Sequence, residues 1–232
     1  QHGAWAMLLV PFVLGVLVSG PVWLHVPLFL FWLSAYFFSH AFLQWVKTGN
    51  IGRFGKPMLL YGALAAIAGI LLVIGKPSLL LWAPAFVPLF LVNVRYARIN
   101  RERAFANDLA AVVQFSLIIF VAWAAAGDGD WQTARSLFFL NLMYFAGTIF
   151  YVKTVIREKH NPRYYAMSVL YHALMPAVAA AACRNWGLAL MFGLLLVRAA
   201  WVPRTKSTVK AVGLLEFAMA TLFSVSVFVW AA

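Results

Sequence analysis

The sequence predicts an all-α integral membrane protein with about nine transmembrane helices. Of its 232 residues, 65% are hydrophobic and only 10% are charged, whereas soluble domains are roughly 45–50% apolar and about 25% charged. The apolar residues gather in unbroken runs of about 17–25 residues, which as helices are long enough to cross a hydrocarbon core. A helix also pairs its own backbone polar groups, as a lipid environment requires.

The apolar runs define the elements in chain order. Stretches such as Gly20-Pro21 and Gly75-Lys76-Pro77-Ser78 separate them, because glycine adopts left-handed conformations and proline cannot continue a helix. All the spans are assigned to one polytopic membrane domain, residues 1–232. The predicted spans are 3–24, 26–46, 57–75, 79–97, 109–127, 136–156, 166–183, 188–203 and 211–232.

Basic residues lie almost entirely on one side of this arrangement. The net charge is +12, and fifteen of the 18 lysines and arginines fall near the connections after the second, fourth, sixth and eighth spans. Cytoplasmic loops carry the excess of lysine and arginine. The sequence therefore predicts a cytoplasmic N-terminus and an external C-terminus in a bacterial inner membrane. It does not predict nucleic-acid binding, which such a charge would suggest in a soluble protein.

Short matches within the chain predict an internal repeat. Trp45-Val46-Lys47-Thr48 corresponds to Tyr151-Val152-Lys153-Thr154, Val94-Arg95 to Val197-Arg198, and Gln114-Phe115 to Glu216-Phe217, at shifts of 106, 103 and 102 residues. Their common order indicates two related four-helix units, 26–127 and 136–232, that follow the first helix in parallel orientation. Membrane proteins built from repeats often place their binding site between them.

Polar side chains inside apolar spans predict a binding site. Such residues are costly in lipid and usually face the bundle interior or a wet cavity. We expect a basic cavity open to the cytoplasm, with lysine and arginine on a ligand headgroup and with histidine and glutamate tuning the proton balance. The candidate cavity residues are His40, Gln44, Lys47, Asn93, Arg95, Gln114, Lys153, Arg157, His172, Arg198 and Glu216.

Simpler interpretations stand beside this one. Glu216 could pair with Arg198 or a histidine only to avoid a bare buried charge. Arg95 and Arg198 could extend to the membrane interface. The histidines could simply bond neighbouring helices.

Several chemistries lack their motifs. The chain has no HExxH, no CxxC and no GxxxxGK[ST] phosphate loop, so we predict no metal site and no cofactor. A haem held by His40 and His172 is left as an alternative, because both lie at similar predicted depth on different helices.

Two segments resemble a known family. The opening Gln1-His2-Gly3-Ala4-Trp5-Ala6-Met7 resembles the N-terminal signature of the YwiC-like membrane proteins. So does Asn100-Arg101-Glu102-Arg103 followed by Asn107-Asp108-Leu109-Ala110. This resemblance implies a membrane protein and no particular chemistry.

The topology and the repeat are also distantly similar to the UbiA-type prenyltransferases. That resemblance implies a nine-helix bundle with a cytoplasmic cavity, and loops after the second and sixth helices in which aspartates bind Mg²⁺ and a diphosphate. The corresponding stretches here, 40–50 and 152–163, contain Lys47 and Lys153 but no aspartate. Mg²⁺ needs oxygen ligands. We therefore do not expect Mg²⁺-dependent prenyl transfer; the sequence favours a protein that is not an enzyme and leaves metal-independent catalysis as an alternative.

The leading hypothesis is a protein that binds or carries an anionic or polar-headed amphiphile, such as an isoprenoid, a quinone or another lipid. One alternative is a metal-independent lipid or prenyl transferase with Glu216 or a histidine as its base. Others are a small-anion transporter, or a haem- or quinone-bearing subunit of a respiratory membrane complex. The expected partners are the bilayer, the lipid ligand and other membrane subunits, which could pack on flat apolar helices such as 58–74.

Overall fold

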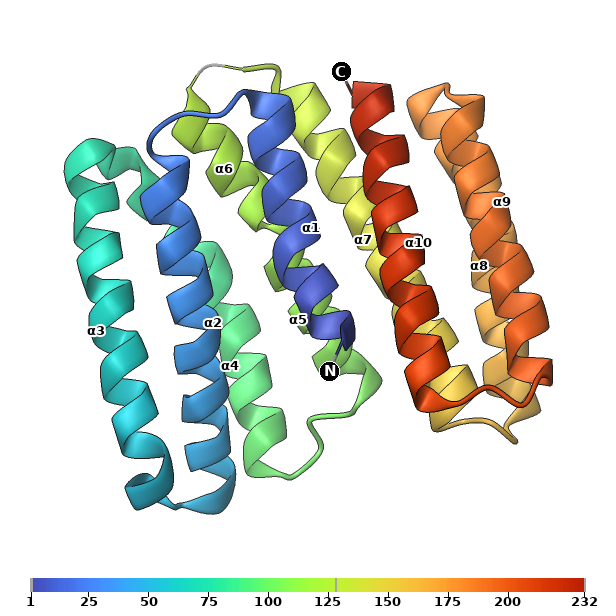
Figure 1. Ribbon diagram of the computed structural model, residues 1–232, viewed down its shortest axis with the longest axis horizontal. Coiled ribbons are helices and arrows are strands. Elements are labelled where there is room, and N and C mark those ends of the chain that lie inside the picture. Colours follow the sequence, from blue (N-terminus) through green and yellow to red (C-terminus); the bar gives the residue numbers. More distant parts are fainter. Residues whose placement is uncertain (1, 128, 232) are drawn as a thin grey trace. The chain divides into compact units, whose positions relative to one another are not determined.

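The computed structural model describes residues 2–127 and 129–231, with side chains from residue 4 onward in these ranges. Gln1 and the side chain of His2, which open the family motif, lie outside this description, as do residues 128 and 232. The described chain is helical and contains no strand (Figure 1). Its elements are α1 (His2–Ser19), α2 (His25–Thr48), α3 (Ile51–Gly75), η1 (Pro77–Trp82), α4 (Ala83–Arg98), α5 (Phe105–Ser116), α6 (Ile118–Ala126), α7 (Trp131–Ile156), α8 (Pro162–Cys183), α9 (Trp186–Trp201), η2 (Val202–Arg204) and α10 (Val209–Ala231).

The helices confirm the predicted all-α membrane class. Over the described residues, eight helical segments are long and apolar enough to cross a membrane. Three of these segments combine two elements: η1 with α4, α5 with α6, and α9 with η2. The remaining helix, α1, has a shorter apolar part, Ala4–Ser19.

Several helix boundaries differ from the prediction: α5, α7 and α8 begin four or five residues before the predicted starts at 109, 136 and 166. The end of α1 and the start of α3 also differ, and for these two the structure shows a local cause. α1 ends at Ser19, before the predicted end at residue 24, because Gly20 adopts a positive φ of 87° and Pro21 follows it. α3 begins at Ile51, six residues before the predicted start at 57. Its first turn is capped by the side chain of Asn50, whose Oδ1 accepts the Arg53 N–H at 3.0 Å.

The chain divides into two compact units. We call residues 15–130 the first unit, and residues 1–14 with 131–232 the second unit. In the first unit, α2 packs along α3 and also contacts α4 and α6, while α4 packs on α5. In the second unit, α8 packs on α7 and α9, and α10 contacts the same two helices. The predicted repeats, 26–127 and 136–232, each lie within one unit; the repeat and the single-domain organisation stay predictions.

Exposure in both units is the reverse of that in a soluble protein. Large apolar side chains on the helix surfaces are open, with Leu59 78%, Ile74 76% and Leu190 75% exposed. At the same time Arg198 and Glu216 are buried. A soluble monomer rarely exposes large apolar patches, whereas lipid is the natural neighbour of such faces. This distribution agrees with a membrane-embedded chain.

Candidate functional sites in the two units

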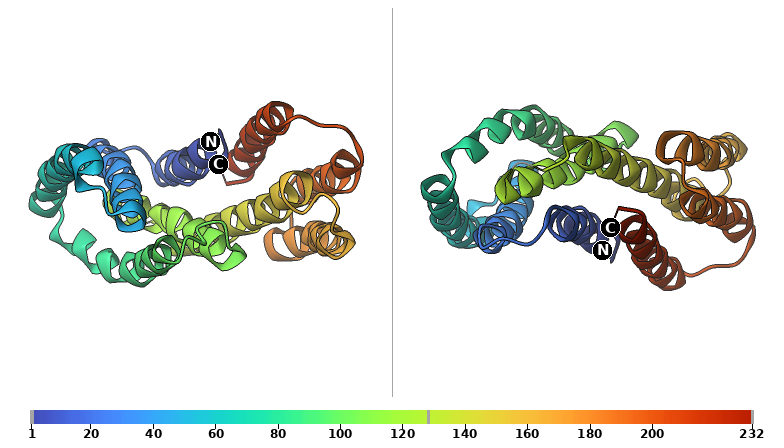
Figure 2. Two further views of the ribbon diagram at one scale, coloured as in Figure 1. Left: turned by 90° about the horizontal axis from the view of Figure 1, so that it is seen from below. Right: turned by 90° about the horizontal axis from the view of Figure 1, so that it is seen from above.

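The first unit contains an apolar cavity of about 870 Å³. α2, α3, η1, α4 and the broken helix α5–α6 contribute its walls, and Figure 2 shows these helices arranged around a common centre. Aromatic rings such as Phe31, Trp32, Phe86 and Phe90 form much of the lining. Ligand pockets in proteins are commonly about 300–1,000 Å³ and mostly apolar, so the cavity is of a size that takes one ligand.

Small residues on α3 make room for this cavity. Gly62, Ala65, Ala66 and Gly69 all line it, and their spacing of three and four places them on one face of the helix. The glycines face rings of α2: a Cβ at Gly62 would lie 3.4 Å from the Phe38 ring. These small residues of α3, which face aromatic rings of α2, therefore leave room for the cavity.

A polar contact lies where the cavity ends. Asn93 Nδ2 on α4 donates to Gln114 Oε1 on α5 at 3.1 Å, and Gln114 also lines the cavity. Nearby, α5 gives way to α6 at Leu117, and the buried Ser116 Oγ has no hydrogen-bond partner. The amide pair thus joins α4 to the break in the last span of the first unit.

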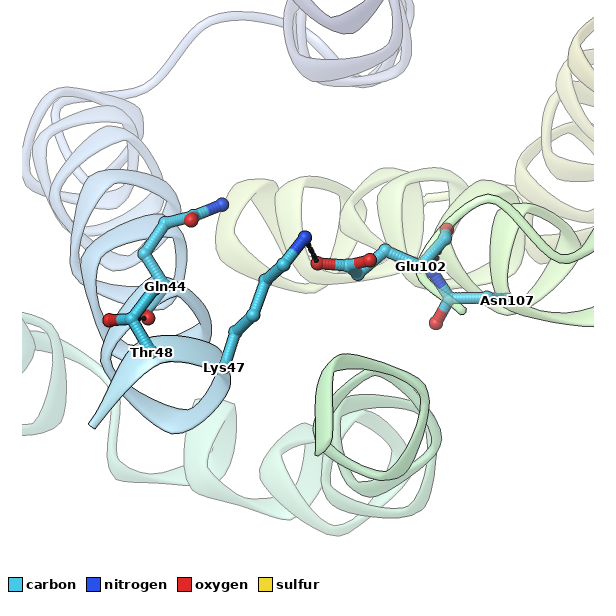
Figure 3. A network of polar contacts seen from close by, with 5 residues as sticks. All are labelled: Gln44, Lys47, Thr48, Glu102 and Asn107. Carbon is cyan, nitrogen blue, oxygen red and sulfur yellow. Dashed lines mark hydrogen bonds and ion pairs between the residues drawn. The ribbon is translucent and has the colours of Figure 1, made fainter. Parts of the chain in front are cut away.

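An ion pair lies at the end of the first unit where α2 ends and the connection between α4 and α5 carries basic residues. The amine of Lys47, near the end of α2, lies 2.6 Å from the Glu102 carboxylate in the connection between α4 and α5 (Figure 3). Asn107 Nδ2 donates to the backbone carbonyl of Glu102 at 2.7 Å and holds this connection in place. The hydrogen bond from Lys47 lowers the pKa of Glu102 below its usual value. Sequence reasoning missed Glu102, although it is the acid of the Arg101-Glu102-Arg103 run.

The second unit contains a buried ion pair. Arg198 Nη1 on α9 donates to Glu216 Oε1 on α10, and both side chains are more than nine-tenths buried. The Arg198 guanidinium also lies over the Tyr151 ring of α7, 4.1 Å from its centroid. The simpler interpretation of Glu216, pairing with Arg198, is thus the arrangement found.

Unsatisfied polar atoms surround this ion pair. Tyr144, Thr148 and Tyr151 lie on one face of α7 at spacings of four and three, and their buried hydroxyl groups make no hydrogen bond of good geometry. Thr148 nevertheless lies close enough to both Tyr144 and Glu216 to interact with them. Arg198 Nε and Nη2 and Glu216 Oε2 also lack partners. Buried polar groups are nearly always paired. The sequence analysis did not include these α7 residues among the candidate site residues, although their helical spacing is visible in the sequence.

His172 of α8 lies beside this group. Its Nδ1 is 2.7 Å from the Ser168 carbonyl, which can only accept, so Nδ1 carries a proton. Its Nε2 has no partner. Gly147 on α7 allows the close approach, since a Cβ there would lie only 3.0 Å from His172 Nε2. The imidazole interacts electrostatically with the charge of Arg198.

The other predicted site residues are dispersed. His40, Arg95 and Arg157 are exposed, Gln44 is half-buried, and Lys153 is buried within α7. Of the eleven candidates, only Gln114 is among the residues that line the first-unit cavity. The wall of this cavity is therefore apolar where a basic lining was expected. Among the described residues, no three histidine, cysteine or acidic side chains come together to hold a metal ion.

These features define the class: a multi-pass helical membrane protein with a buried ion pair and a partly buried amide pair between its spans. Within this class, the chain belongs to the YwiC-like family, whose family model, described as "YwiC-like protein", matches residues 1–123.

Two relatives extend the similarity over nearly the whole chain. The "Uncharacterized protein YwiC" of Bacillus subtilis (strain 168) is 37% identical over 225 residues, covering 96% of this chain and 93% of that protein. An "Uncharacterized protein" of Haemophilus influenzae is 36% identical over 231 residues, with the same two coverages. No solved structure matches the chain significantly.

Proposed function

We propose that this protein binds or carries an amphiphile, such as an isoprenoid, a quinone or another lipid with a polar or anionic head. The observation that carries the proposal is the first-unit cavity of about 870 Å³ with its almost wholly apolar wall. The tail of the amphiphile would occupy the space beside the bare face of α3. A polar solute would gain nothing from such a wall, because it would lose its hydrogen bonds to water.

The position of the polar groups supports a headgroup end. The α2 part of the lining ends at Ser39, and the next polar groups along that helix are His40, Gln44 and Lys47. Lys47 follows Ser39 by eight residues, a rise of about 12 Å at 1.5 Å per residue. On α4 the lining ends at Leu91, followed by Asn93 and Arg95. Basic side chains bind phosphate or carboxylate directly.

The basic end also supports an orientation. Lys47, Arg95 and the connection after α4 lie toward one end of the first unit, and the Lys47–Glu102 contact joins two of these parts. Since lysine and arginine concentrate in cytoplasmic loops, this end would face the cytoplasm and the N-terminus would be inside. The ligand would then enter with its head at the cytoplasmic surface.

The polar contacts support an internal repeat as well. In the first unit, Gln114 of the last span bonds Asn93 of the span before it. In the second unit, Glu216 and Arg198 make the corresponding contact. Glu216 and Gln114 are the residues that the sequence repeat aligns, and Asn93 is two positions from Arg95, the counterpart of Arg198.

Filling the cavity tests the proposal. Ala65→Phe places a ring inside the cavity, whereas Ala63→Phe, two residues away, is a matched control on the exposed face of the same helix. Each protein would be purified in a mild detergent, and its retained lipids measured by mass spectrometry. We expect a lipid retained by the parent and by Ala63→Phe to be lost from Ala65→Phe. Identical lipid profiles in all three proteins would refute the proposal.

A further inference from the structure

We propose that the second unit holds a site for a small oxyanion, which binds the free edge of the Arg198 guanidinium while Glu216 takes up a proton. This site is separate from the amphiphile cavity, lies wholly among α7, α9 and α10, and does not rest on the proposed function. Its ligands would be planar anions that present two oxygen atoms, as a carboxylate does.

The geometry of Arg198 is the first step. Of the Arg198 nitrogens only Nη1 donates to Glu216 Oε1, and Nε and Nη2, which share one edge of the guanidinium, make no hydrogen bond of good geometry. The Tyr144 hydroxyl group is the neighbour that interacts with this side chain. This edge is the fork with which arginine binds two oxygens of one carboxylate or phosphate. The Tyr151 ring packs against the face of the guanidinium, an arrangement that leaves the edge available.

The surroundings supply further donors. The hydroxyl groups of Tyr144, Thr148 and Tyr151 are buried and make no hydrogen bond of good geometry. Thr148 interacts with Tyr144 and Glu216, and Tyr144 and Tyr151 interact electrostatically with Arg198 and Glu216. Each unsatisfied buried group is destabilising relative to a satisfied one. An oxyanion accepts several hydrogen bonds at once, and so it would satisfy a set of groups that are mostly donors.

The first unit shows that charge is not needed to join these spans. There, the neutral side chains of Asn93 and Gln114 make the corresponding contact. A buried ion pair carries a larger desolvation cost than a neutral pair, and intramembrane charges mark functional sites. If Arg198 and Glu216 served only to hold α9 to α10, an amide pair would do so. We therefore infer that the two charges have a chemical role beyond holding the helices together.

A proton makes anion binding electrically neutral. Glu216 gains a proton from solvent, becomes uncharged and releases Arg198 Nη1. The anion then balances the guanidinium, so the buried net charge is zero before and after. The titratable groups facing Glu216 are Tyr144 and Tyr151 from α7 and Arg198 from α9. His172 of α8 lies beside Arg198 with its Nε2 unpartnered.

Proton uptake on anion addition tests the proposal. The full chain in neutral detergent, weakly buffered near pH 6.5, would receive sodium acetate or sodium nitrate, and a pH indicator would report protons. Neither anion buffers appreciably at this pH, and sodium chloride controls for ionic strength without the planar oxygen pair. We expect uptake approaching one proton per oxyanion bound, and little uptake with chloride. Equal responses to all three salts would overturn the proposal.

Variants separate the two partners. Glu216→Gln, which imitates the protonated acid, should bind acetate without proton uptake, and with an affinity that no longer depends on pH. Arg198→Gln should lose binding, whereas Arg163→Gln, which changes an exposed arginine, should behave as the parent. If Arg198→Gln does not fold, the parent and Glu216→Gln still decide. Acetate binding by Glu216→Gln with unchanged proton uptake would overturn the role of Glu216.

A last comparison identifies the source of the anion. The parent protein in nanodiscs of neutral phosphatidylcholine should still respond to acetate. A response that appears only when anionic phosphatidylglycerol is present, and never with the free anions, would assign the site to a lipid headgroup and would overturn the small-oxyanion proposal.

Discussion

Lys47 and Glu102 form an ion pair, 2.6 Å from Nζ to Oε1, that ties the end of α2 to the connection between α4 and α5. Both side chains are about one-third exposed, so water screens the attraction. Exposed pairs of this kind contribute about 0.2–1 kcal/mol. The contact therefore positions the basic end of the first unit more than it stabilises the fold.

The stability contributed by this pair should depend on pH. The pKa of Glu102 is lowered in the folded protein, first by the hydrogen bond from Lys47. The folded state thus binds the proton less readily than the unfolded state, so the contribution is present above the usual value of 4.5 and is lost as the pH falls through the lowered value. Thermal unfolding from pH 7 to pH 3 should show parent and Glu102→Gln converging in acid. Lys47→Gln should converge in the same way, and a difference that grows in acid would contradict this sign.

Breaking the buried pair should cost far more than replacing it. Arg198→Met leaves the Glu216 carboxylate buried without its partner, and such a change costs about 3–5 kcal/mol. The double variant Arg198→Met/Glu216→Leu removes both charges and should recover most of that loss. A double-mutant cycle by thermal unfolding in detergent measures the coupling. Additive losses would show that the two side chains do not act as a pair.

Gly147 should resist enlargement. A Cβ there would lie 3.0 Å from His172 Nε2 and 3.1 Å from the Tyr171 ring, so Gly147→Ala requires these side chains to shift. Both are held by hydrogen bonds to backbone carbonyl groups, and we expect a cost of about 1–3 kcal/mol. Gly193→Ala in α9 is the matched control, since a Cβ there meets no heavy atom within 4 Å. Alanine favours a helix by about 0.5–1 kcal/mol over glycine, so the control should unfold at the same temperature as the parent or a higher one. Equal unfolding temperatures for the two variants would be evidence against this packing.

The proposed orientation predicts which connections reach the outside. In a Cys183→Ser background, Ser78→Cys marks the connection after α3, and Lys159→Cys marks the connection after α7; both native residues are exposed. A membrane-impermeant thiol reagent applied to intact cells should label Ser78→Cys and should reach Lys159→Cys only after the cells are opened. The opposite labelling would reverse the orientation.

The spans and their limits are largely readable from the sequence. Hydropathy is a property of a continuous segment, so the apolar runs place most helices within a few residues of where they lie. Two of the larger differences have local causes: Gly20-Pro21 ends α1 early, and the Asn50 cap starts α3 early. α5, α7 and α8 also begin four or five residues before their predicted starts. Loop charge is equally local, because each lysine or arginine is assigned to a connection by its position in the chain alone.

The sequence predicts only in part which polar side chains contact one another. Arg198 and Glu216 stand out because charges inside apolar runs are conspicuous, and their pairing was one of the alternatives. Tyr144, Thr148 and Tyr151 were missed because polar-tipped aromatics and threonine are common in membrane helices. Glu102 was missed because a loop acid gives no sign of its partner across the unit.

The sequence by itself determined the membrane class, the position of most of the spans, the uneven charge and the presence of costly polar groups inside the spans. The tertiary structure decided which of these groups meet, and that the cavity of the first unit is apolar. The physical reason is helix rotation. In helices that are hydrophobic on every side, the apolar pattern does not specify which face turns inward. Only packing between helices sets Gln114 against Asn93 and Arg198 against Glu216.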